Sequence, residues 1–106
     1  MAVYSITQDV RELARSVLVA DFSDAEILKE QTAAQSKIWV VTQKNDWTPA
    51  DYQYEWIKKM ETKLAAIYVL EHYNIIEILP VLDAWNKEID SSLAALTDTI
   101  VYSPIR

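Results

Sequence analysis

The sequence predicts an all-α protein, in which residues 1–97 form a small four-helix domain with a long central helix, and residues 98–106 form an extended C-terminal arm. The chain of 106 residues contains no glycine, whereas about 7% is usual, so turns must be made by Asn, Asp and Pro. In four segments the apolar residues recur every three or four positions, the spacing of one face of a helix. Ser, Thr or Pro stands at the start of each segment, as is typical of helix N-termini.

The first helix is expected to follow a short N-terminal arm, residues 1–6, whose Val3, Tyr4 and Ile6 can dock on the core. Thr7 is a suitable N-cap, and the helix is predicted to continue to about Leu18. Its apolar stripe consists of Ile6, Val10, Leu13, Ala14 and Val17.

The second helix is predicted over residues 24–44. Ser23 and Glu26 form a capping box at its start, and Asn45 is the expected left-handed residue after its end. The core seam consists of Ile27, Ala34, Ile38 and Val41. A further set on this helix has two interpretations, the edge of the seam in water or a subunit interface: Leu28, Gln31, Gln35 and Trp39.

The central helix is predicted over residues 48–74, with Thr48 as N-cap and Pro49 at the first helical position. Asn74 is expected to end it with a positive φ. Residues 64–70 are apolar or tyrosine throughout, so this half of the helix should be surrounded by protein. The lysines of the first half, with Glu55 and Glu61, are interpreted as an ordinary solvated surface.

Residues 75–79 fit either a turn of helix or an extended link. Pro80 then opens a fourth helix that is predicted to end near Thr97, with an apolar stripe of Leu82, Trp85, Ile89, Leu93 and Leu96. The side chains expected to be buried together in the common core are Leu13, Ile38, Trp56, Leu64, Ile67, Leu70, Trp85 and Ile89.

The C-terminal arm is rich in residues that favour extended backbone, and Pro104 prevents a helix from continuing through it. Two interpretations remain open: a strap over the helices of its own domain, or a segment that pairs with the sheet edge of a partner. For the second, the binding residues would be Ile100, Val101, Tyr102, Pro104 and Ile105.

Composition excludes several function classes. The net charge of −6 disfavours tight binding to nucleic acid or to anionic membranes. Without glycine there is no phosphate loop, dinucleotide turn or nucleophile elbow. The longest apolar run, residues 64–70, is far shorter than the ~20 residues of a membrane span. The lack of cysteine excludes disulfides and thiolate metal sites, which fits an intracellular protein without a secretory signal.

No catalytic, metal-binding or cofactor-binding residue is predicted. His72 is the only histidine, and it has no positioned partner that would make it a recognisable base. Asp24 and Glu26 are explained by helix capping, and Glu26 and Glu30 are expected to be solvated on the polar face of the second helix. The sequence therefore argues against an enzyme.

The order of parts resembles the head–tail connector (adaptor) proteins of tailed bacteriophages. The resemblance covers roughly residues 4–73 and rests on three stretches and the alanines at 33 and 34: Ile6-Thr7-Gln8-Asp9-Val10-Arg11, Phe22-Ser23-Asp24-Ala25-Glu26-Ile27 and Lys63-Leu64-Ala65-Ala66-Ile67-Tyr68. It implies a virion protein, assembled in the host cytoplasm, whose subunits form a homo-oligomeric ring between the portal and the tail. It also implies that DNA passes through the ring without specific binding, that the C-terminal arm engages the portal, and that no cofactor is needed.

A second class fits the same composition, namely a small acidic helical protein of the cell that binds and regulates a protein partner. Gene neighbourhood, or electron microscopy of the purified protein with and without a portal, would separate the two classes.

Overall fold

The computed structural model describes the backbone of residues 3–101 and the side chains of residues 3–99, and this part of the chain is all-helical, with no strands. Four α-helices follow one another, with one turn of 3-10 helix before the last. Their bounds are α1 Thr7–Arg15, α2 Asp24–Thr42, α3 Tyr54–Glu71, η1 Ile76–Ile78 and α4 Leu79–Val101. The predicted four-helix fold is confirmed.

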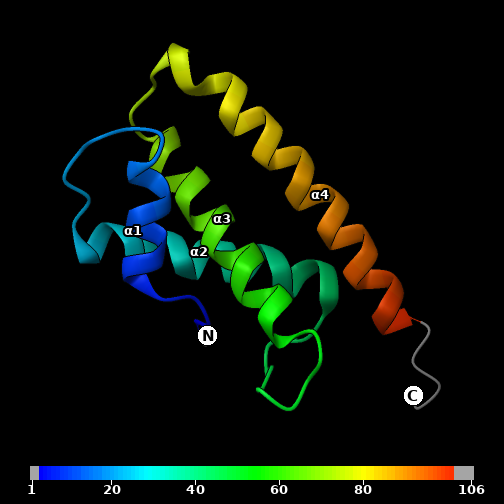
Figure 1. The fold of residues 1–106 in the computed structure, drawn as a ribbon. Coiled ribbons are helices and arrows are strands. Elements are labelled where there is room, and N and C mark those ends of the chain that lie inside the picture. Colours follow the sequence, from blue (N-terminus) through cyan, green and yellow to red (C-terminus); the bar gives the residue numbers. More distant parts are fainter. Residues whose placement is uncertain (1–2, 102–106) are drawn as a thin grey trace.

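Helix α3 is central, because each of the other three α-helices makes its most extensive contact with it. In Figure 1, α1 and α4 lie on either side of it. Of residues 64–70, all are buried except Tyr68, which is half-buried. The prediction that this half of α3 is surrounded by protein is confirmed.

The start of the central helix was predicted wrongly. Thr48 caps a tight turn instead: its hydroxyl accepts the N–H of Ala50, and its own N–H donates to the Asp51 carboxylate at 2.8 Å. The N–H of Asp51 donates to Thr48 O, and the N–H of Tyr54 donates to Asp51 O, so turns closed by bonds between residues three positions apart continue up to α3. These local bonds hold residues 48–53 in turns, so α3 begins only at Tyr54.

A left-handed residue was predicted after α2 and after α3, and only the second of these two positions is confirmed. Asn74 has the predicted left-handed backbone (φ 51°), but after α2 it is Gln43 (φ 58°), not Asn45, that adopts it. The Gln43 amide donates to Val40 O, and the Thr42 hydroxyl donates to Ile38 O and accepts the N–H of Lys44. These bonds satisfy the last turn of α2 two residues earlier than predicted.

Helix α1 is also shorter than predicted, and Thr7 is not its cap. No side chain caps its start, and the Thr7 hydroxyl donates to Gln31 Oε1 on α2 at 3.1 Å. By contrast, Ser23 caps α2 as predicted, accepting the N–H of Glu26 at 3.1 Å.

The segment before α4 was predicted to be either a turn of helix or an extended link. Residues 76–78 form a helical turn.

Helix α4 continues through residues 98–101, where the extended arm was predicted to begin. The hydroxyls of Thr97 and Thr99 donate back to Leu93 O and Leu96 O, so these β-prone residues are accommodated within helical backbone. Ile100 and Val101 therefore belong to α4. Tyr102, Pro104 and Ile105, the rest of the predicted arm, lie outside the described residues.

The core is formed by apolar residues of all four α-helices, but Val41, which was predicted in the core seam of α2, is 40% exposed and lies outside it. Five of the eight predicted members are buried, namely Ile38, Leu64, Ile67, Leu70 and Ile89. The other three, Leu13, Trp56 and Trp85, only pack against the core from partly exposed positions. Trp47 and Phe22 are buried instead, because the connections before α3 and α2 fold over the core.

Candidate protein-interaction surfaces

Of the four α2 residues that were predicted at the surface, two are buried and two are exposed. Gln31 and Gln35 are buried, with 1% and 0% of their area exposed, whereas Leu28 and Trp39 are 52% and 38% exposed. Both interpretations of this set placed the two glutamines at the surface, and both were wrong on that point. Position along the helix explains the result, since Gln31, Gln35 and Ile38 share one face and point toward the other helices.

Gln31 is buried because it holds the N-terminal arm. Its amide nitrogen donates to the carbonyl oxygen of Ser5 at 3.0 Å and to the Ser5 hydroxyl at 2.9 Å, while its oxygen accepts from Thr7. All polar atoms of this side chain thus have partners, which offsets the cost of removing the amide from water.

Glu61 is the second anchor of the arm, and it was wrongly assigned to the solvated surface of α3. Its side chain is fully buried. Its carboxylate accepts the N–H of Tyr4 at 3.1 Å, the N–H of Ser5 at 2.6 Å and the Ser5 hydroxyl. Helical spacing contains the signal, because Glu61 follows buried Ile57 by four residues and precedes buried Leu64 by three.

Burial raises the pKa of Glu61 above its ordinary value of 4.5. The hydrogen bonds from Ser5 and Tyr4 oppose this shift, since they stabilise the charged form, but desolvation is the larger effect. Ionising this carboxylate in the folded protein therefore costs free energy, and the three donors from Tyr4 and Ser5 offset only part of that cost.

Tyr4 fixes the same arm to the α2–α3 connection. Its hydroxyl donates to Asn45 O at 2.6 Å and accepts the N–H of Trp47 at 2.9 Å, and its ring meets that of Tyr54 edge-on. The expectation that Tyr4 docks on the core is confirmed, while Ile6 remains half exposed.

Gln35 contrasts with Gln31, because neither atom of its amide has a hydrogen-bond partner among the described residues. A buried amide without partners costs roughly 1–3 kcal/mol in proteins. This residue lowers the stability of the described fold rather than adding to it.

The outward side of α2 presents a surface that we term the outer stripe: Leu28, Thr32, Ser36, Trp39 and Val40. Four of these recur every four residues and form one ridge of the kind that packs into the groove of another helix. The hydroxyls of Thr32 and Ser36 donate to Leu28 O and Thr32 O on their own helix. None of its five members is charged, although the exposed Lys29 lies beside them on α2, and two of its polar groups already have partners within the helix.

A second exposed apolar surface lies where η1 passes into α4. We term it the apolar turn, and its members are Ile76, Leu79, Pro80 and Val81. Ile76 is 76% exposed and Leu79 48% exposed. Apolar groups that gather in an exposed surface, unlike single exposed ones, are characteristic of interaction sites.

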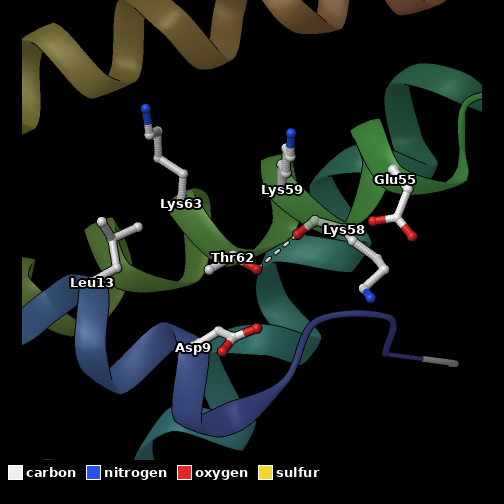
Figure 2. Close-up of a pocket in the computed structure, with 7 residues that line it drawn as sticks. All are labelled: Asp9, Leu13, Glu55, Lys58, Lys59, Thr62 and Lys63. Carbon is white, nitrogen blue, oxygen red and sulfur yellow. Dashed lines mark hydrogen bonds between the residues drawn. The ribbon is translucent and has the colours of Figure 1, made fainter.

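A groove of about 450 Å³ lies between α1 and α3, and Figure 2 shows the side chains that line it: Asp9, Leu13, Glu55, Lys58, Lys59, Thr62 and Lys63. Lys59 and Lys63 extend from α3 on the side of α4, where Lys63 pairs with Glu88. Asp9 rises from α1 on the opposite side. Because carboxylates accompany the lysines, the groove does not favour a ligand of one charge.

His72 lies at the C-terminal end of α3, and its Nε2 is 2.6 Å from Glu30 Oε2. Glu30 was expected to be solvated, but it is buried, with only 6% of its area exposed. Burial, with the charges of Glu71 and Glu30, raises the pKa of the nearby Tyr68. In the described part of the chain, no three His, Cys, Asp or Glu residues are grouped so that they could hold a metal ion.

The end of α4 is tied to the α2–α3 connection by a hydrogen bond from Gln53 Nε2 to Thr99 Oγ1 at 3.3 Å. The predicted binding residues Ile100 and Val101 therefore continue from an anchored part of the helix.

Within the described residues, no helix combines the length and the apolar character needed to cross a membrane.

No protein-family model matches this chain, and no curated protein or solved structure matches it either.

Proposed function

We propose that this protein is a structural subunit that works by packing against other copies of itself and against partner proteins, in the manner of a bacteriophage head–tail connector. The observation that carries the proposal is the outer stripe of α2. In one of the two interpretations of the sequence, Leu28 and Trp39 are interface residues, and both are exposed on α2, where no member of the outer stripe is charged.

Two physical features of the outer stripe favour a protein partner. Trp and Leu side chains supply the large apolar anchors on which binding energy usually depends. The internally bonded hydroxyls of Thr32 and Ser36 reduce the number of polar groups that a partner must desolvate without compensation.

The net charge of −6 supports the further proposal that DNA passes such an assembly without being bound. On the same proposal, the end of α4 and the residues after it, from Ile100 to Ile105, engage the portal-side partner. The virion is then the site where the protein acts, and neither a cofactor nor catalysis is required.

The test of self-packing is the molar mass of the protein in solution, measured by light scattering over a range of concentrations. The unchanged chain should form oligomers, and Leu28→Asp or Trp39→Asp should shift it toward the monomer. Val19→Asp is the matched control, because Val19 is an exposed apolar residue in the α1–α2 connection, away from the outer stripe. A chain that stays monomeric at every concentration would contradict the proposal.

The portal contact needs a separate experiment. A chain that ends at Val101 should keep its helicity and its melting temperature but lose attachment to a portal ring seen by electron microscopy. If the shortened chain attaches normally, the contact lies elsewhere. If the full chain instead binds a cellular protein and no portal, the regulator class is favoured.

A further inference from the structure

The two exposed apolar surfaces lie in different places on the molecule. The apolar turn is at the N-terminal end of α4, next to η1. The outer stripe ends near the C-terminus of α2, and the connection that follows α2 is bound to the C-terminal end of α4 through Gln53 and Thr99. Figure 1 shows the α3–α4 turn at the top and the α2–α3 connection at the bottom. The apolar turn and the C-terminal end of the outer stripe thus lie toward opposite ends of α4, which at about 1.5 Å per residue is roughly 34 Å long.

The charges around the two surfaces are opposite in sign. Residues 64–86, which include the apolar turn, contain no lysine or arginine but carry Glu71, Glu77 and Asp83. Residues 31–45, the second half of α2 and its end, contain no aspartate or glutamate but carry Lys37 and Lys44. Of these two, Lys44 is paired with Asp46, which leaves Lys37 as the lysine available to a partner. A contact of either surface with itself would place like charges together, whereas a contact between the two would place unlike charges together.

We infer that the apolar turn of one copy packs on the outer stripe of α2 in the next copy, so that the subunits associate head to tail. This inference rests on the proposed function and specifies its partner surface. Ile76 and Leu79 supply the apolar projection, and Trp39 and Val40 supply the surface that receives it. Glu77 then lies on the side of Lys37, whose ammonium has no ion-pair partner among the described residues.

A head-to-tail contact differs from a two-fold contact in a way that can be measured. Each copy uses two different surfaces, so an open assembly has one free surface of each kind at its two ends until it closes. A two-fold contact uses the same surface twice, and pairing leaves nothing free. Complementary variants separate the two cases.

The experiment uses Ile76→Asp and Trp39→Asp, each in the full chain, with molar mass measured by light scattering and composition by native mass spectrometry. Each change places a charge at an exposed position, and circular dichroism checks that helicity is kept. Each variant alone should lose roughly thirtyfold or more in association constant, as expected for a central anchor. Mixed in equal amounts, they should form a dimer with one copy of each variant, because one intact pair of surfaces remains, and that dimer should grow no further.

Several results would overturn the inference. If Ile76→Asp assembles as the unchanged chain does, the apolar turn is not part of the contact, and the proposed function stands without it. If both variants are monomeric and their mixture is monomeric too, the contact is not between these two surfaces. If the unchanged chain is itself monomeric, the proposed function fails together with the inference.

A charge exchange provides a second route that does not depend on the aspartate variants. Glu77→Lys and Lys37→Glu should each weaken association, and the two changes combined in one chain should restore it. A double variant weaker than either single variant would contradict the proposed pairing. Val19→Asp should associate like the unchanged chain.

Discussion

Ser5 and Glu61 are 56 positions apart in the sequence, yet the N–H of Ser5 lies 2.6 Å from the Glu61 carboxylate in the interior of the fold. The same carboxylate accepts the Ser5 hydroxyl and the N–H of Tyr4. Two backbone donors of the arm, which has no helix or strand of its own at this point, are satisfied in this way. Glu61 therefore fixes the arm to α3, with Gln31 holding the same serine from α2.

Glu61→Ala should destabilise the protein by roughly 1–3 kcal/mol, because it leaves these buried donors without an acceptor. Chemical denaturation gives the difference in unfolding free energy. The control is Glu55→Ala on the exposed face of α3, where a change below about 0.5 kcal/mol is expected. A loss at position 61 no larger than that at position 55 would mean that the arm contributes nothing.

Stability should also depend on the protonation of Glu61. Its folded pKa is raised above 4.5, so the folded state binds the proton more tightly than the unfolded state does. The contribution of protonated Glu61 to the stability of the fold is therefore fully present below pH 4.5, and it is lost as the pH rises through the folded pKa. The exposed Asp46 contributes in the opposite sense. Its hydrogen bond to Lys44 lowers its pKa below 3.8, so its stabilising contribution is present above pH 3.8 and is lost as the pH falls through the folded pKa.

The measurement is the unfolding free energy of the unchanged chain and of Glu61→Gln across this pH range. Since glutamine does not titrate, the difference between the two curves isolates Glu61. Relative to Glu61→Gln, the unchanged chain should lose unfolding free energy as the pH rises above 4.5. Parallel curves would show that Glu61 has the same pKa in the folded and unfolded states.

Leu64→Ala should cost about 2–5 kcal/mol, because Leu64 is fully buried in the middle of the core. The measurement is a denaturant melt. A loss below about 0.5 kcal/mol would mean that this side of α3 does not face the core.

Gln35→Met should stabilise the protein by about 1 kcal/mol. Methionine is similar to glutamine in length, and the change removes a buried amide that has no partner among the described residues. The same change at position 31 is the matched control, and it should destabilise, since Gln31 is bonded to Ser5 and Thr7. Equal effects at both positions would contradict the difference between them.

Gln43→Gly should stabilise the end of α2 by about 0.5–1 kcal/mol, because Gln43 has a left-handed backbone that glycine adopts without steric cost. Asn45→Gly should bring no such gain, since Asn45 does not have a positive φ. Thermal melting of the two variants provides the comparison. A larger gain at position 45 would place the helix end where the sequence first predicted it.

The sequence by itself determined the features whose causes are local. The cap formed by Ser23 and Glu26 involves neighbouring residues. The preference of asparagine for left-handed backbone identified Asn74 after α3, although it failed at Asn45 after α2. The apolar run of residues 64–70 allowed only a buried helix. Such features depend on the chain within a few positions, so periodicity and residue type were sufficient to predict that four helices form and where most of their apolar faces lie.

Only the tertiary structure decided which polar residues lie inside. Glu30, Gln31 and Glu61 look like surface residues by type, but each occupies a helix position that faces the other helices. Burying them is tolerable because each meets a partner distant in sequence: His72 for Glu30 and Ser5 for both Gln31 and Glu61. A polar group can leave water only where such a partner replaces its hydration, and that condition is set by how the helices pack.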